Sequence, residues 1–108
     1  METDKLIFEM QAEMLRVLAN PKRLMMVKVL GKGEKTVGEI AAQAGIELQN
    51  ASQHLRIMKS NGIVSSRRDG QTIYYRMTTP IFAECSELVR QALMENLEST
   101  RNLLHGMK

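Results

Sequence analysis

The segment NASQHLRIMKSNG, Asn50 to Gly62, carries amides, two hydroxyls and two cations where an ordinary solvated helix would more often carry Glu and Lys. Gln can pair bidentately with adenine in the major groove of DNA, Ser can contact base edges or phosphates, and Arg can bind guanine or a phosphate. A helix that presents these types from its N-terminal half fits the docking of a recognition helix. The side chains that we predict to contact DNA from this helix are Gln49, Asn50, Ser52, Gln53, Arg56 and Lys59.

At about 100° per residue, the other side of this helix gathers side chains that we expect to pack inward. They are Leu48, Ala51, His54, Leu55 and Met58. For His54 we favour a packed, hydrogen-bonded role over a metal-binding or catalytic one, because no carboxylate or hydroxyl accompanies it at a catalytic spacing. The alternative interpretation of the polar side is a solvated face with no partner.

The positive charge of the chain is concentrated in its middle. Between residues 49 and 77, five basic residues stand against the single acid Asp69, whereas the two ends are near neutral or acidic. Such a distribution indicates a polyanion partner. Arg67 and Arg68, near the tip of an expected hairpin, and Arg76, on its returning strand, can bind phosphates or enter a narrow minor groove. Alternatively, these cations only aid solubility or keep an edge strand from pairing.

Helical periodicity and turn signals divide the chain into short elements without a linker. Asn20–Pro21 suits the start of a helix, Thr36 and Glu39 have the spacing of a capping box, and Asp69–Gly70 is typical of a hairpin turn. We predict helices over about 4–18, 21–30 and 36–44, then the polar helix ended by Gly62, a hairpin over about 63–77, and a helix over about 81–104. All of them belong to a single domain, residues 1–108.

This order predicts a mainly α fold with a β-hairpin: a winged helix-turn-helix (helix-turn-helix about 36–61, wing about 63–77) with extra terminal helices. The chain resembles the ArsR/SmtB-type winged-helix repressors over about residues 14–80. Four blocks keep their mutual spacing: VLANPKRLMMVKVL, TVGEIAAQAGI, ASQHLRIMKSNGIV and RRDGQTIYYRM. Glu47 and Leu48 depart from the family, which commonly has a small hydroxyl residue and a polar residue there, so the bases read are not specified.

The resemblance implies a homodimer, because the first and last helices (about 4–18 and 81–104) form the dimer interface of that family. Independently, the apolar faces of these helices are broader than the short elements between them can cover. A two-fold dimer presents two reading helices about 10–10.5 base pairs apart, which predicts an imperfect palindrome as the DNA site. A monomer that folds both helices onto its own core is the alternative.

The sequence says less about the signal that would switch DNA binding than about DNA binding itself. Metal-sensing relatives carry paired cysteines on the helix here written TVGEIAAQA or an acid-and-histidine set on the last helix, and this chain has neither. We therefore predict no metal and no cofactor, although Glu84, Cys85, Glu87 and His105 could meet across a dimer. Cys85, the only cysteine, is a possible redox residue or simply a small buried side chain. A small organic molecule is an equal alternative as the effector.

These observations predict a sequence-specific DNA-binding transcriptional regulator, a homodimeric repressor released by a thiol, redox or small-molecule signal. An enzyme is not expected, because the chain lacks a nucleophile–base pair, a phosphate loop and a metal set. The acidic N-terminus and the absence of a long apolar run predict a cytoplasmic protein without a membrane partner. The competing hypothesis is a winged helix that serves as a protein-interaction module.

Overall fold

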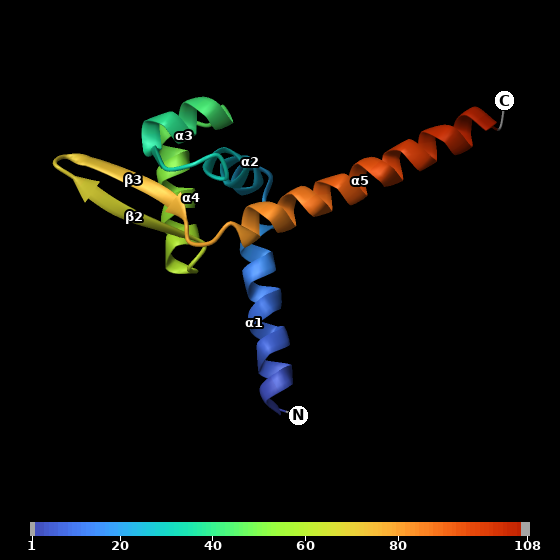
Figure 1. The fold of residues 1–108 in the computed structure, drawn as a ribbon, viewed down its shortest axis with the longest axis horizontal. Coiled ribbons are helices and arrows are strands. Elements are labelled where there is room, and N and C mark those ends of the chain that lie inside the picture. Colours follow the sequence, from blue (N-terminus) through green and yellow to red (C-terminus); the bar gives the residue numbers. More distant parts are fainter. Residues whose placement is uncertain (1, 107–108) are drawn as a thin grey trace.

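The computed structural model describes residues 2–106 and has a small body from which two helices project (Figure 1). The body contains α2 (Pro21–Leu30), α3 (Val37–Ala44), α4 (Leu48–Ser60) and a small sheet, while α1 (Glu2–Leu18) and α5 (Ile81–Gly106) extend away from it. The predicted mainly α, winged helix-turn-helix fold is confirmed. Met1, Met107 and Lys108, which the predicted domain includes, lie outside the described residues.

The helix boundaries follow from local capping chemistry. The side chain of Asn20 accepts a hydrogen bond from the backbone N–H of Arg23 at 3.1 Å, and Pro21 occupies the first turn of α2. Thr36 and Glu39 form the predicted capping box at the start of α3, and Gly45 ends that helix in the left-handed conformation (φ 67°). By contrast, Glu47 makes no side-chain hydrogen bond at the start of α4.

The sheet has three strands, one more than the predicted hairpin. Strands β2 (Val64–Asp69) and β3 (Thr72–Met77) pair antiparallel, and β1 (Lys35–Thr36) adds to the free edge of β3. A two-residue strand next to a helix cap shows no alternation in sequence, which is why it was missed. The turn is also one residue later than predicted, because Asp69 still pairs with Thr72; Gly70, with φ 65°, begins it.

The core lies where α2, α3, α4 and the base of the sheet meet. Its fully buried side chains are Met26, Val27, Ile40, Leu55, Met58, Ile63 and Val64. Leu55 and Met58 confirm the predicted inward side of α4, but Leu48 does not belong to it, since 53% of its surface is exposed. Leu48 is the first residue of α4, one turn beyond the buried Ala51, so the core does not reach it.

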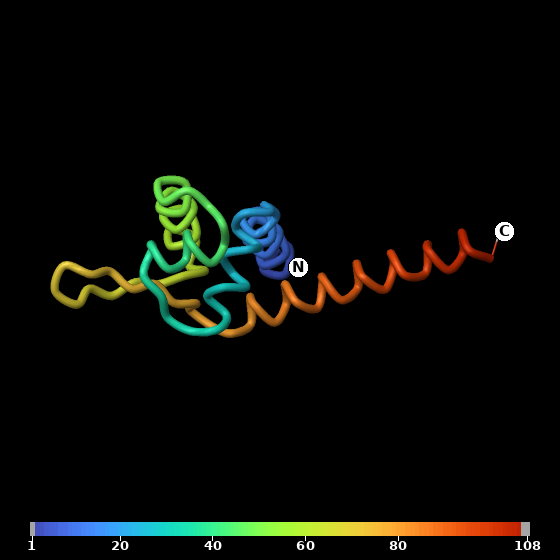
Figure 2. The backbone as a smooth tube through the Cα atoms, turned by 90° about the horizontal axis from the view of Figure 1, so that it is seen from above, coloured from blue at the N-terminus to red at the C-terminus, as the bar shows by residue number. Residues whose placement is uncertain are grey.

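Most of α1 and α5 packs against no other element among residues 2–106. Of the 17 residues of α1 only Val17 and Leu18 are buried, and α5 buries none of its 26. In the view from above, α5 points away from the body on the side opposite the wing, which is the hairpin of β2 and β3 (Figure 2). The radius of gyration is 17.1 Å, against about 13 Å for a compact chain of this length. The prediction that the chain cannot cover these helices is confirmed.

Within residues 2–106, no helix combines the length and the apolar character needed to cross a membrane.

Replacing Leu55 by Ala should lower the free energy of unfolding by about 2–5 kcal/mol, because a fully buried side chain is lost and a cavity remains. Leu48→Ala, the same change on the exposed start of the same helix, should cost less than about 0.5 kcal/mol. Urea denaturation at a fixed protein concentration measures both. Equal losses for the two variants would contradict this description of the core.

Candidate nucleic-acid interface

The outer face of α4 is polar and open to solvent. Gln49, Gln53 and Arg56 are all exposed and lie within about 60° of one another around the helix axis. Asn50 and Ser52 are half-buried at the margins of this face. The buried residues of the helix lie on the opposite side, so α4 presents amides and a guanidinium outward, as the sequence predicted.

One arginine holds the inner face of α4 to two other helices. Nε of Arg23 donates a hydrogen bond to Nδ1 of His54 at 3.1 Å, and one of its terminal nitrogens donates to the carbonyl oxygen of Val17 at 2.9 Å. Arg23 therefore connects the end of α1 and the start of α2 to α4. His54 has the predicted packed, hydrogen-bonded role. Sequence reasoning missed Arg23, because only the fold brings it to His54.

The environment of His54 favours its neutral form. Partial burial, followed by the positive charges of Arg23 and Lys22, lowers the pKa of His54 from its ordinary value. A neutral ring is also what the geometry requires, since Nδ1 must accept the hydrogen bond from Arg23.

Strand alternation divides the wing into two faces. Val64, Ser66 and Arg68 share one face with their partners on β3, and Ser65 and Arg67 share the other. The first face adjoins α4, because Val64 is buried in the core and Nζ of Lys59 donates to Oγ of Ser66 at 2.7 Å. Arg68, which is exposed, thus projects from the same side as α4.

The other two predicted wing cations lie on the opposite face and have partners there. Arg67 forms a salt bridge with Glu34 at 2.6 Å, and its guanidinium carbon lies 4.5 Å from the ring centre of Tyr74. Nε of Arg76 donates to Oγ of Ser65 at 3.0 Å. The structure therefore places Arg68 of the wing on the same side as Lys59 and the rest of α4, but it does not place Arg67 or Arg76 there.

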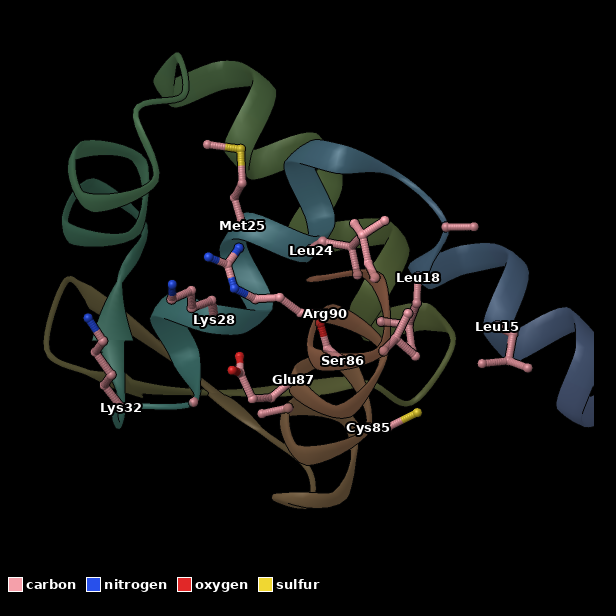
Figure 3. A pocket seen from close by; sticks show the side chains of 15 residues that line it. Leu15, Leu18, Leu24, Met25, Lys28, Lys32, Cys85, Ser86, Glu87 and Arg90 are labelled. Carbon is pink, nitrogen blue, oxygen red and sulfur yellow. The ribbon is translucent and has the colours of Figure 1, made fainter. Parts of the chain in front are cut away.

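An apolar groove of about 700 Å³ opens between the α1–α2 corner and the first half of α5 (Figure 3). Leu18 and Leu24 contribute to its apolar wall, and the charged side chains of Lys28, Glu87 and Arg90 also line it. Cys85 is half-buried and lines the same groove. In the described part of the chain, no three His, Cys, Asp or Glu side chains lie close enough together to hold a metal ion.

Comparison with known proteins agrees with this geometry. A family model described as a helix-turn-helix domain matches residues 18–67. The chain is similar to the HTH-type transcriptional regulator Rv0081 of Mycobacterium tuberculosis, with 30% identity over 109 residues that cover 100% of this chain and 95% of the relative.

Solved structures match as well. The homodimeric winged helix-turn-helix DNA-binding domain Mb0332 of Mycobacterium bovis, described as a possible ArsR-family transcriptional regulator, superposes with a TM-score of 0.79 at 33% identity, covering 92% of each chain. The transcriptional repressor BigR of Xylella fastidiosa gives 0.73 at 35% identity, covering 84% of this chain and 92% of that one.

Acidification should destabilise the protein through His54. Because the pKa of His54 is lower in the folded than in the unfolded state, its contribution to stability is complete above about pH 6.5 and falls as the pH drops from there toward the folded-state pKa. His54→Asn keeps a hydrogen-bond acceptor but cannot titrate, so it should lose less stability between about pH 7.5 and pH 5.5.

Urea denaturation across this pH range measures the difference. His105→Asn, which changes the exposed histidine of α5, is the matched control and should follow the wild type. If His54→Asn lost as much stability on acidification as the wild type, the role assigned to His54 would be wrong.

Proposed function

The chain belongs to the ArsR-type winged helix-turn-helix transcriptional regulators, and we propose that it is a homodimeric repressor that binds double-stranded DNA through α4 and the wing. The observation that carries this proposal is the exposed polar face of α4, with Arg68 and Lys59 on the same side of the molecule. The proposal includes no enzymatic activity, and it locates the protein in the cytoplasm with its DNA.

In this proposal α4 enters the major groove. Gln49, Gln53 and Arg56 contact base edges, and Ser52 and Asn50, at the margins of the same face, contact bases or phosphates. Lys59 and Arg68 bind the backbone and set the orientation of the helix. Arg76 is exposed but lies on the far face of the wing, so it is the weaker candidate for a phosphate contact.

The dimer is proposed from the uncovered apolar surface of α1 and α5. Phe8 and Met10 on α1 and Leu88, Val89 and Leu93 on α5 are each more than half exposed. Large apolar side chains left exposed in this number, on two helices that the body does not cover, mark a protein interface. The Mycobacterium bovis structure to which this chain is similar is a homodimer. Two copies related by a two-fold axis would bind an imperfect palindrome with half-sites about one DNA turn apart.

The proposed releasing signal acts in the groove between α2 and α5. Cys85 lines this groove together with apolar and charged side chains, so oxidation of the thiol or binding of a small organic molecule there would change how α5 packs on α2. The proposal includes no metal signal, because the chain lacks the paired cysteines and the acid-and-histidine set that metal-sensing relatives carry.

Selection of bound DNA from a random pool, at known salt and with oxidant or reductant present, tests the function directly. We expect a palindromic site and an affinity that falls with salt by a log–log slope of about −0.9 per phosphate contacted. Oxidant sensitivity that disappears in Cys85→Ser would support the thiol signal. Recovery of no preferred sequence, with a flat salt dependence, would instead favour a protein-interaction module.

Gln53→Ala and Arg68→Ala should weaken binding to the selected site in different ways. Loss of the amide on the base-reading face should reduce the preference for that site over random DNA by about 1–3 kcal/mol. Loss of Arg68 should weaken binding to all sequences alike and make the salt slope shallower by about 0.9. Titration of both DNAs at several salt concentrations measures the two effects. A Gln53 variant with the wild-type ratio would remove this residue from the reading face.

Leu93→Asp should dissociate the dimer, because it puts a carboxylate in the centre of the apolar stripe of α5. We expect the dimer dissociation constant to rise about a hundredfold or more. Gln91→Asp adds the same group on the opposite, polar side of α5 and is the matched control. Sedimentation equilibrium measures both variants, and an unchanged Leu93→Asp dimer would place the interface elsewhere.

A further inference from the structure

The far face of the wing carries an ion pair between residues 33 positions apart in sequence. Nε of Arg67 donates to both carboxylate oxygens of Glu34 at 3.0 Å, and its terminal nitrogen donates to Oε1 at 2.6 Å. The guanidinium also lies over the ring of Tyr74, 4.5 Å from its centre. This bidentate, stacked geometry fixes an arginine far better than a single surface contact does.

The contact with Arg67 also favours the ionised form of Glu34. The hydrogen bond from Arg67 holds the pKa of the Glu34 carboxyl below its usual value, and the charge of Arg76 acts in the same direction. At neutral pH the carboxylate is therefore ionised and offsets the charge of Arg67. A phosphate would therefore have to compete with this carboxylate for the guanidinium.

Glu34 belongs to a segment that is also held by contacts with β3 and α5. It follows the end of α2 and immediately precedes β1, whose Thr36 pairs with Tyr74 of β3. A few residues earlier, Gly31 packs so closely on Ala83 of α5 that an added Cβ would lie 3.2 Å from the Cβ of Ala83. The ion pair thus connects the outer strand of the wing, β2, to the junction of α2 and α5.

We propose that Glu34 and Arg67 are positioning residues that hold the wing in the orientation in which Arg68 reaches DNA, and that Arg67 is not itself a phosphate ligand. This inference rests on the proposed DNA-binding function and replaces the sequence-based assignment of Arg67 as a DNA contact. It follows from the register of β2, because Arg67 and Arg68 point to opposite faces and only Arg68 shares the face of α4.

The test is a charge-swap cycle on the full-length protein. Glu34→Gln and Arg67→Gln should each weaken binding to the selected DNA about fivefold. Arg67→Glu should weaken it further, because two carboxylates then face each other. The double variant Glu34→Arg with Arg67→Glu should restore the affinity to within about twofold of wild type. Arg67→Gln should keep the wild-type salt slope, whereas Arg68→Gln, the matched neighbour, should make the slope shallower by about 0.9.

Amide hydrogen exchange of the free protein gives a readout that does not depend on DNA. Exchange in β2 and β3 should become about fivefold faster in Glu34→Gln and Arg67→Gln and return to the wild-type rate in the charge swap. A shallower salt slope in Arg67→Gln, a swap that stays weak, or unchanged exchange would each overturn the proposal. A wild-type protein that binds DNA without salt dependence would refute the proposed function instead, and the exchange rates would then decide the role of this pair alone.

Discussion

The fold and its proposed DNA-binding surface both depend on burial of one side of α4. Leu55 and Met58 are fully buried beside Met26 of α2 and Ile40 of α3, and a helix fixed along one side must present the other. Because α4 lacks a side-chain cap, this packing and the hydrogen bond from Arg23 to His54 hold it in place. The outward direction of Gln49, Gln53 and Arg56 is thus a consequence of the apolar core, not of any contact that these residues make.

The same core is too small to bury the apolar side chains of the whole chain. It occupies the middle of the sequence, while α1 and α5 together contribute only Val17 and Leu18 as buried residues. A long helix with an apolar stripe in water is unfavourable, since its stability in proteins comes mainly from packing. The elements that we propose to contact DNA are therefore complete in one copy, whereas the terminal helices need a partner. A two-fold DNA-binding dimer requires both of these features.

The sequence was sufficient wherever structure depends on neighbours along the chain. The Asn20 cap, the capping box of Thr36 and the helix limits were predicted because local hydrogen bonds and periodicity determine them. It failed where distant segments meet. The ion pair of Glu34 with Arg67 and the hydrogen bond of Arg23 with His54 join residues 33 and 31 positions apart, and β1 exists only because β3 offers it an edge. Arg67 and Arg68 were treated alike as adjacent cations, although alternation along a strand sends them to opposite faces.

These two long-range contacts also connect each terminal helix to one element of the proposed DNA-binding surface. Arg23 joins the last turn of α1 to α4 through Val17 and His54. The packing of Ala83 on Gly31 connects α5 to the segment that carries Glu34, and Glu34 in turn binds the wing through Arg67. A ligand or oxidation event that shifts α1 or α5 would therefore move the reading helix or the wing through a short chain of direct contacts. An effector can shift such an equilibrium only by binding two arrangements unequally, so these contacts would have to differ between the arrangements that it selects.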